Sequence, residues 1–248
     1  MLLQSGAEPA DFVLFLGRFH PLFVHLPIGI LFVAFLMEVA SRYPRFKGVK
    51  DAIPFVLLLG AVTGAMAAAV GYLLSLGGGY NEQTLSLHQW MGIGMTVLAF
   101  LAFAFKAGWI RWPEKAAHWG DMVLLSVVML LLMGTGHLGG TLTHGSDYLT
   151  QYMPGPLRVM VGLKAEGGYQ RPEITHIDSA HAFHGVVEPI LQEKCVSCHN
   201  QDKMKGDLML ISPEMIMKGG EGGSVLKNGN PDSSELFKRL VLPESHDD

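Results

Sequence analysis

The residues best suited to chemistry in this sequence are Cys195, Cys198 and His199, in the segment Cys-Val-Ser-Cys-His. Two thiols at this spacing can form thioether bonds to the two vinyl groups of one haem, and the adjacent imidazole can ligate the iron. The chain has no other cysteine, so a zinc site built from further thiolates is excluded. A redox-active dithiol is typical of a thioredoxin-like βαβ context, which this sequence does not contain. The motif therefore predicts covalently bound haem c.

A group of histidines near the ends of apolar segments is the second candidate for chemistry. His20 and His25 begin the first such segment, His88 begins the third, and His137 ends the fourth. Neutral imidazoles that face one another across a helix bundle can ligate a b-type haem on both sides. We expect one bis-histidine haem b, with His25, His88 and His137 as first candidates. His20 would complete a second pair for a second haem b, and His144 is expected to be exposed.

Two alternatives stay open for these histidines. A histidine within a turn of the membrane interface can simply be hydrated and hydrogen-bonded. A histidine can also accept a proton as quinol is oxidised. Small residues surround one of the candidates and would let a planar group or another backbone approach closely; the segment is Gly134-Thr135-Gly136-His137-Leu138-Gly139-Gly140.

The composition is that of a membrane protein, because 49% of the residues are hydrophobic, only 16% are charged and the mean hydropathy is +0.30. The net charge of -4 argues against a nucleic-acid partner. Glu38 is the main charge in the first apolar segment, and we expect it to pair with Arg42 one turn later at the membrane surface. Four segments are long enough to cross a bilayer, which needs ~20 apolar residues. They are Pro21–Ala40, Ile53–Leu76, His88–Phe105 and Asp121–Leu138.

Basic residues set the expected orientation of these four segments. The connection between the second and third segments, residues 77–87, has no Lys or Arg, whereas the other two connections are basic. Because short basic loops stay in the cytoplasm, we expect four spans in a bacterial inner membrane, with both termini and the haem motif in the periplasm. Haem c is attached on that side in bacteria, so two independent arguments agree. The basic residues are Arg42, Arg45, Lys47, Lys50, Lys106, Arg111 and Lys115.

We divide the chain into three parts. Residues 1–144 form a four-span domain with the histidine cluster on its periplasmic side, residues 145–182 a periplasmic linker, and residues 183–248 a soluble domain that carries the haem motif. The linker holds a short apolar run, Leu157–Leu163, which is too short to cross a membrane and is expected to lie along its surface. Apolar residues recur at helical spacing over 187–191, which predicts a short helix leading into the motif.

Several segments of the soluble part carry a resemblance to a known family: Glu188-Pro189-Ile190-Leu191, Lys194-Cys195, Cys198-His199-Asn200, Lys205-Gly206-Asp207-Leu208, Lys218-Gly219-Gly220 and Gly229-Asn230-Pro231. On these residues the part from about Phe183 onward resembles the planctomycete-type cytochrome c domain. The first 150 residues resemble a family of four-span membrane proteins, through His20-Pro21, Val24-His25-Leu26-Pro27 and the glycine-rich segment at His137. The two resemblances imply an all-α fold in which a four-helix transmembrane bundle is followed by a small class I-like cytochrome c domain. They also imply a membrane-anchored electron carrier of bacterial respiration.

The second axial ligand of haem c departs from this pattern. In the cytochrome family it is usually a Met in a Met-Pro-Pro segment that precedes a final helix. This sequence stops at Pro243-Glu244-Ser245-His246-Asp247-Asp248, about where that Met would follow. We therefore expect the cytochrome c domain to be incomplete at its C-terminal end. The alternatives within the chain are Met204, Met209, Met215 and Met217, with His246 a weaker candidate.

Two functions are compatible with these features. In the first, quinol or a partner subunit reduces haem b in the bundle, and the electron passes to haem c and then to a periplasmic or membrane acceptor. In the second, the four spans anchor and assemble a larger respiratory complex, aided by the GxxxG pattern at Gly60 and Gly64, and haem c is the only redox centre. The sequence has no nucleophile–base pair, phosphate loop or metalloprotease helix. We therefore expect an electron-transfer subunit, such as a component of a quinol–cytochrome c oxidoreductase, rather than a stand-alone enzyme.

Overall fold

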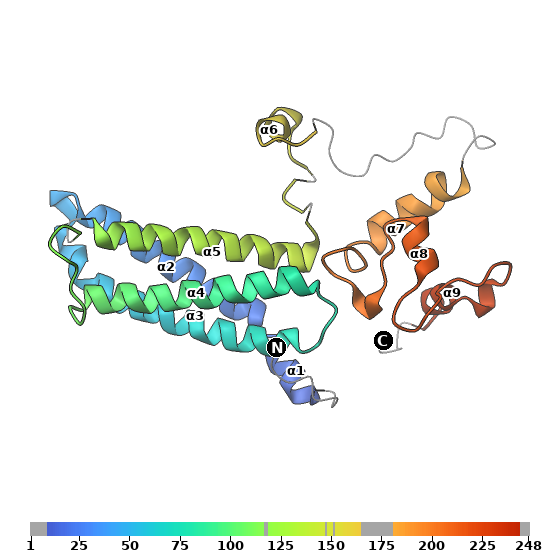
Figure 1. The fold of residues 1–248 in the computed structure, drawn as a ribbon, viewed down its shortest axis with the longest axis horizontal. Coiled ribbons are helices and arrows are strands. Elements are labelled where there is room, and N and C mark those ends of the chain that lie inside the picture. The colour runs from blue at the N-terminus through green and yellow to red at the C-terminus, as the bar shows by residue number, and fades with distance from the viewer. Residues whose placement is uncertain (1–8, 117–118, 147, 151, 165–180, 244–248) are drawn as a thin grey trace. The chain divides into compact units, whose positions relative to one another are not determined.

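The computed structural model describes residues 9–116, 119–146, 148–150, 152–164 and 181–243. Apart from isolated β-bridges, the regular secondary structure of these residues is helical (Figure 1), which confirms the predicted all-α fold. The chain divides into two compact units. The first comprises residues 1–78 and 85–139, and the second comprises residues 79–84 and 140–248.

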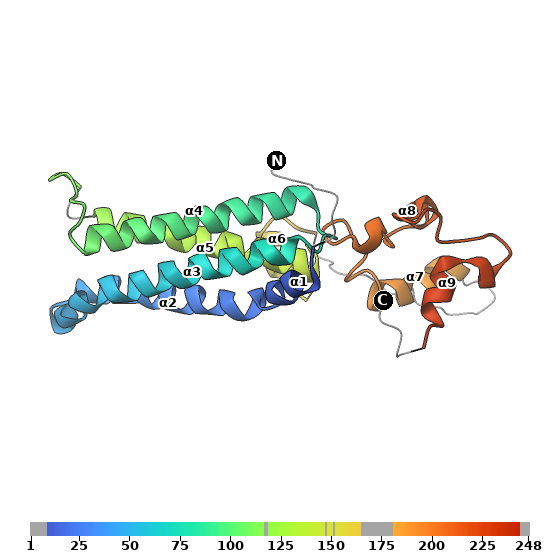
Figure 2. The same ribbon diagram turned by 90° about the horizontal axis from the view of Figure 1, so that it is seen from below.

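Four long helices make up most of the first unit and lie side by side along their length (Figures 1 and 2). They contain the four predicted spans, and by length and composition each can cross a membrane. A proline in the first turn, where no backbone N–H is needed, starts both α2 and α3. A short helix α1 (Asp11–Gly17) precedes α2, and a 3₁₀ helix η1 (Pro44–Ala52) joins α2 to α3. The long helices are α2 (His20–Ser41), α3 (Ile53–Ser75), α4 (Glu82–Lys106) and α5 (Gly120–His144).

One apolar core joins the four long helices. Each helix buries only a narrow stripe, and many large apolar side chains stay exposed on the outside, as expected for a bundle whose outer surface faces lipid. Gly60 and Gly64 belong to the inside. A Cβ atom on Gly60 would overlap Leu31, and one on Gly64 would press on Thr96. The GxxxG pattern therefore packs helices within this chain. The buried core residues are Leu31, Ala34, Ile53, Leu57, Ala61, Met95, Ala99, Ala102, Leu125, Val128 and Leu132.

Charged side chains close one end of this core. Glu38 of α2 is 2% exposed, and its carboxylate lies 3.0 Å from Nη2 of Arg42, which confirms the predicted pair. Lys106 at the end of α4 also reaches Glu38, at 2.6 Å, and at the same time lies 2.7 Å from Asp121 at the start of α5. The indole of Trp112 donates a hydrogen bond of 2.7 Å to Asp121. Buried charges must be paired, and this network ties three helices together.

The other end of the bundle contains the starts of α2 and α4 and the final turns of α3 and α5 (Figure 1). Two glycines lie against histidine rings at this end. A Cβ atom on Gly71 of α3 would overlap the ring of His20, and one on Gly139 of α5 would lie 3.1 Å from the ring of His88. The chain leaves the bundle for its C-terminal part at this same end, because α5 finishes there.

The second unit is built from short helices around a small apolar cluster of Leu191, Leu210, Ile216 and Val225. Its helices are α6 (Gly155–Met160), η3 (Ala182–Val187), α7 (Glu188–Lys194), η4 (Lys205–Asp207), α8 (Pro213–Lys218), η5 (Pro231–Ser233) and α9 (Glu235–Leu240). Helix α7 confirms the predicted helix ahead of the haem motif. Within the predicted linker, α6 covers part of the apolar run, and residues 165–180 lie outside the described residues.

The two compact units do not follow one another in a single order along the chain, and the predicted division at residue 144 stays a prediction. The structure separates the units after Gly139 and assigns residues 79–84 to the second one. The reason is a set of backbone hydrogen bonds within that unit. The Asn81 amide donates to the Asp202 carbonyl at 3.0 Å, and the Met204 amide donates to the Gly79 carbonyl at 3.0 Å. Hydropathy could not predict such pairing, since it depends on contacts between residues far apart in the sequence.

Candidate haem sites

One hydrogen-bonded turn contains all three residues of the predicted haem c motif. Helix α7 ends where the Cys195 amide donates to the Leu191 carbonyl at 2.9 Å. The Cys198 and His199 amides both donate to the Cys195 carbonyl, at 3.0 and 3.1 Å. This turn fixes the spacing of two thiols and one imidazole, which is the donor set that a covalently attached haem requires.

The imidazole of His199 is oriented by its neighbours. Its Nδ1 lies 3.2 Å from the Leu208 carbonyl oxygen, and its own carbonyl accepts a 2.9 Å hydrogen bond from the Leu210 amide. A carbonyl cannot donate, so Nδ1 carries the hydrogen and Nε2 is left with its lone pair. A ligand histidine anchored through one ring nitrogen holds the other in a fixed direction, as metal-binding histidines generally do.

Both thiols are free and half-buried. Cys195 packs against the apolar cluster of the second unit. Burial raises the pKa of the Cys195 thiol, and the neighbouring Cys198 raises it further. The two thiols are not joined in a disulfide, so each is available to add across a vinyl group of haem. The residues of this turn therefore fit haem c.

Sequence reasoning missed two features that shape the turn after His199. The Asn200 side chain accepts hydrogen bonds from the amides of Asp202 and Lys203, at 2.8 and 2.9 Å, and donates to the Val196 carbonyl at 2.7 Å. An Asn side chain commonly bonds to the backbone two residues later, which is a turn signal that could have predicted this loop. Gly219 has φ of +79°, and a Cβ atom there would overlap the Gly223 carbonyl, so the segment Gly219-Gly220-Glu221-Gly222-Gly223 forms a tight turn.

The structure distributes the proposed distal ligands over the second unit. Met204 forms an isolated β-bridge with His199 through its backbone. Met209 and Met215 are half-buried, whereas Met217 is 54% exposed. His246 lies outside the described residues. An exposed thioether is a poor candidate for a ligand that must be shielded from water, so Met217 is the weakest of the four methionines.

In the bundle, the structure brings together His20 of α2 and His88 of α4. Their ring centroids are 6.2 Å apart and their planes are nearly perpendicular, at 89°. The Nδ1 atom of His20 lies 3.0 Å from the Ala67 carbonyl oxygen, and that of His88 lies 3.0 Å from the Thr135 carbonyl oxygen. Both rings are thus anchored through Nδ1, which leaves Nε2 of each ring as the free lone pair.

The structure does not place His25 and His137 in this pair. Both side chains are exposed on the outside of the bundle, and Nδ1 of His25 contacts the Pro21 carbonyl of its own helix. His144 is exposed, as predicted, and its ring stacks on Tyr148 with centroids 4.4 Å apart. The sequence did hold a signal for this outcome. His25 follows His20 by five residues, and five residues turn an α-helix by about 500°, so the two cannot share one face.

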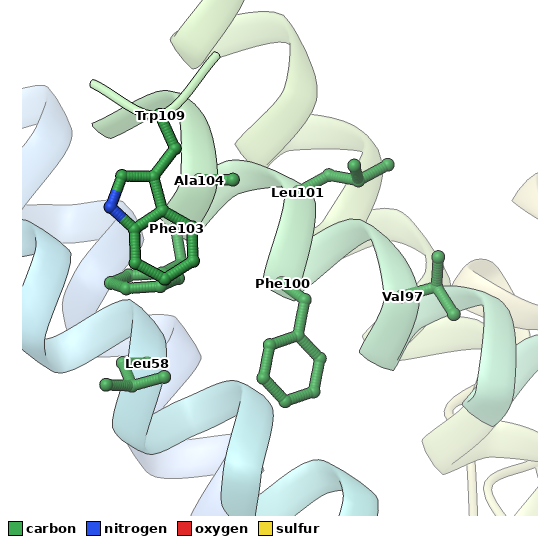
Figure 3. A pocket seen from close by; sticks show the side chains of 7 residues that line it. All are labelled: Leu58, Val97, Phe100, Leu101, Phe103, Ala104 and Trp109. Carbon is green, nitrogen blue, oxygen red and sulfur yellow. The ribbon is translucent and has the colours of Figure 1, made fainter. Parts of the chain in front are cut away.

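An apolar hollow lies on the outer surface of the bundle between α3 and α4 (Figure 3). Leu58, Phe100 and Trp109 are among the seven side chains that line it, and none of the seven is polar apart from the indole nitrogen. The lining residues of α4, from Val97 to Ala104, lie in the half of that helix away from His88. The hollow offers no ligand atom and has the character of a surface that accepts lipid chains, so it is not part of a haem site.

Comparison with known families supports both halves of this description. Residues 18–148 match the family described as predicted membrane protein (DUF2231), and residues 195–246 match the family described as planctomycete cytochrome C. No curated protein matches the chain. No solved structure matches it either. The first family match covers more than half of the chain and includes the four long helices, and the second begins at Cys195. This chain belongs to the DUF2231 family of predicted membrane proteins and carries a planctomycete-type cytochrome c domain in the same polypeptide.

Proposed function

We propose that this protein is a membrane-anchored c-type cytochrome that transfers electrons at the periplasmic face of a bacterial inner membrane, as a subunit of a respiratory complex. A haem b in the bundle relays electrons from quinol or a partner subunit to haem c. The observation that carries the proposal is the Cys195–His199 turn, with His199 anchored to the Leu208 carbonyl, in a chain that also has four membrane-length helices.

The residues of the turn have separate tasks. Cys195 and Cys198 fix the position of the haem through covalent bonds, and His199 presents Nε2 to the iron. When bound, haem supplies reversible one-electron chemistry. The apolar cluster around Leu191 and Leu210 excludes water on the protein side, and such burial helps to set the reduction potential. The chain itself needs no acid, base or nucleophile for this task.

The basic loops support a periplasmic location for the cytochrome domain. The loop between α2 and α3 carries Arg45, Lys47 and Lys50, and the loop between α4 and α5 carries Arg111 and Lys115. Residues 76–81, between α3 and α4, contain no Lys or Arg. Basic loops remain in the cytoplasm, so the ends of the bundle where α4 begins and α5 ends belong to the periplasmic side.

The alternative function is a plain anchor, with haem c as the only redox centre. The GxxxG pattern was one argument for this anchor, since it could have packed against another subunit. Gly60 and Gly64 instead pack against Leu31 and Thr96 inside the bundle, so this argument is weaker than the sequence suggested. The two functions differ in one property that can be measured directly. Only the relay has a second haem that is reduced by quinol before haem c.

Vesicles of defined orientation test the proposal. Haem c would first be reduced in right-side-out and inside-out membrane vesicles that contain the full chain. Ferricyanide, which does not cross membranes, would then be added. We expect rapid oxidation of haem c only in right-side-out vesicles, and sequential reduction of b-type and c-type bands when a quinol is supplied. Rapid oxidation only in inside-out vesicles would refute the orientation, and reduction of haem c by quinol without any b-type band would favour the plain anchor.

A further inference from the structure

We infer that His20 and His88 are the two axial ligands of a single haem b inside the bundle. This inference rests on the proposed function, which places a haem b in the bundle, and it assigns the ligands of that haem. It replaces the broader group of four histidines by one pair. The two residues come from different helices, α2 and α4, and their rings lie close together at the end of the bundle where α5 finishes.

The separation of the two rings is compatible with two imidazoles bound to one metal ion. With metal–nitrogen bonds of about 2 Å, and about 1 Å from each nitrogen to its ring centre, the centroids should be about 6 Å apart. The observed separation is 6.2 Å. Each ring already has Nδ1 fixed by a backbone carbonyl, Ala67 for His20 and Thr135 for His88, so each has Nε2 to offer.

The chemistry of the surroundings favours haem over a bare metal ion. Among the described residues, no group of three or more His, Cys, Asp or Glu side chains is placed to hold a metal. Zinc needs four ligands, and copper sites also use more than two. Haem iron brings four nitrogens of its own and needs only two axial ligands from the protein. Two histidines therefore supply enough protein ligands for a haem but too few for a free metal ion.

The main apolar core does not extend to the level of the two histidines, although Leu142 of α5 is also buried near this end. In every one of the four helices, the buried apolar core lies on the side of Glu38 and not at the level of the histidines. Around the two rings stand Gly71 and Gly139, whose missing Cβ atoms would overlap or crowd His20 and His88. Glycine in a helix interior costs stability, and at these two positions the missing side chain makes room for the imidazole rings of His20 and His88.

A buried hydroxyl provides an independent indication of a missing partner. Oγ1 of Thr135 is inaccessible to solvent and has no hydrogen-bond partner among the described residues. The carbonyl of the same residue accepts the hydrogen bond from His88. Buried polar atoms are almost always satisfied, so an unpaired hydroxyl on the residue that anchors His88 suggests that a further polar group completes the site. A haem propionate, which can accept a hydrogen bond from a hydroxyl, is a group of that kind.

Single substitutions in the full chain separate this assignment from its alternatives. The variants are His20→Ala and His88→Ala for the proposed pair, His25→Ala and His137→Ala for the two other candidates, and His144→Ala as the matched control. For each purified protein, the pyridine haemochrome spectrum gives haem b per chain, the haem stain after a denaturing gel gives haem c, and far-UV circular dichroism gives helix content. We expect His20→Ala and His88→Ala each to lose at least 80% of haem b while haem c and helix content are retained.

Two further measurements keep the test valid if a variant loses stability. His88→Gly should regain a six-coordinate, low-spin haem b spectrum when imidazole is added, because the free base can occupy the vacated position. Gly71→Ala, whose methyl group would overlap the His20 ring, should lower haem b content, whereas Gly29→Ala, where a Cβ meets nothing within 4 Å, should not.

The outcomes distinguish failure of this inference from failure of the proposed function. If the parent protein holds haem b but His25→Ala and His137→Ala lose it while His20→Ala and His88→Ala keep it, the ligand assignment is wrong and the relay stands. If the parent protein holds haem c and no haem b, the relay itself is wrong. Retention of haem b in His20→Ala or His88→Ala, with an unchanged low-spin spectrum, also overturns the assignment.

Discussion

Glu38 shares its carboxylate between two cations that differ mainly in burial, and this makes the energy of the network testable. Arg42 lies 3.0 Å from Glu38 with a side chain that is 30% exposed. Lys106 lies 2.6 Å from Glu38 and 2.7 Å from Asp121 with a side chain that is 7% exposed. Lys106→Met removes the cation that bridges the two carboxylates, and Arg42→Gln removes the outer one.

The two changes should cost very different amounts of folding free energy. Breaking a buried ion pair leaves an uncompensated charge and typically costs about 3 to 5 kcal/mol. Because Arg42 stays beside Glu38 in Lys106→Met, we expect the lower end, about 3 kcal/mol. Arg42→Gln loses a partly exposed pair, worth up to about 1 kcal/mol, and a cation–π contact with Trp119 at 5.7 Å, which is worth about the same.

Reversible unfolding of the purified protein in mixed detergent, followed by far-UV circular dichroism, measures both free energies. Lys47→Met is the matched control, since it removes one exposed positive charge on the same side of the bundle. Glu38→Gln should cost less in the Lys106→Met protein than in the parent, because neighbouring groups in one network are not additive. Equal losses for Lys106→Met and Arg42→Gln, or a Lys106→Met protein as stable as the control, would show that the network is hydrated and that the burial argument is wrong.

The remaining predictions concern the haem c unit. Gly219→Ala should reduce covalent haem on a stained gel several-fold, since the backbone there has φ of +79° and a methyl group meets the Gly223 carbonyl, whereas Gly222→Ala has open space and should not. Ser212→Ala should raise the pKa of Glu214, which the Ser212 side chain lowers by a hydrogen bond, and NMR titration of the carboxyl would measure the shift; an unchanged value would contradict it. In haem-free protein, burial raises the pKa of the Cys195 thiol, and alkylation requires the thiolate. The alkylation rate of Cys195 should therefore keep increasing with pH at values where an ordinary thiol is already fully ionised and reacts at a constant rate. Cys198→Ser should move that profile to lower pH, because Cys198 is the second cause of the raised pKa.

Hydropathy was sufficient to predict the four membrane helices, because a bilayer demands long uncharged segments whatever their packing. It was insufficient to predict which side of each helix faces inward. Pro27, Leu31 and Glu38 are all buried on α2, and Glu38 follows His20 by 18 residues, which is five turns of about 3.6 residues. His20 therefore shares the inner face, and His25 does not.

The same rule holds on α4 and α5. His88 lies seven residues before the buried Met95, about two turns, and so shares its face, whereas His137 follows the buried Leu132 by five residues and is rotated away from it. All four histidines lie near the membrane surface, so this criterion did not distinguish them. His20 and His88 differ from His25 and His137 in sharing a helix face with the buried core residues, and this could be established only after the core was known.

The haem c motif needed no such register, because its three residues are almost contiguous and the backbone of a single turn positions them. The tertiary contacts around it were not predictable in the same way. The hydrogen bond from His199 to the Leu208 carbonyl and the side-chain bonds of Asn200 depend on how the following loop folds back. Sequence spacing thus predicted the chemistry of the site, while packing determines the orientation of its imidazole.

Covalent haem content of the purified full chain is the most direct test of the central claim. The protein would be produced with a haem c maturation system, separated on a denaturing gel and stained for haem, beside Cys195→Ala and Cys198→Ala and a known c-type cytochrome from the same cells. We predict a stained band at the mass of the 27.0 kDa chain, with a c-type pyridine haemochrome. The staining should be weakened in each single variant and lost in the double variant Cys195→Ala/Cys198→Ala. An unstained band, beside a stained control cytochrome, would contradict the assignment of this protein as a membrane-anchored c-type cytochrome.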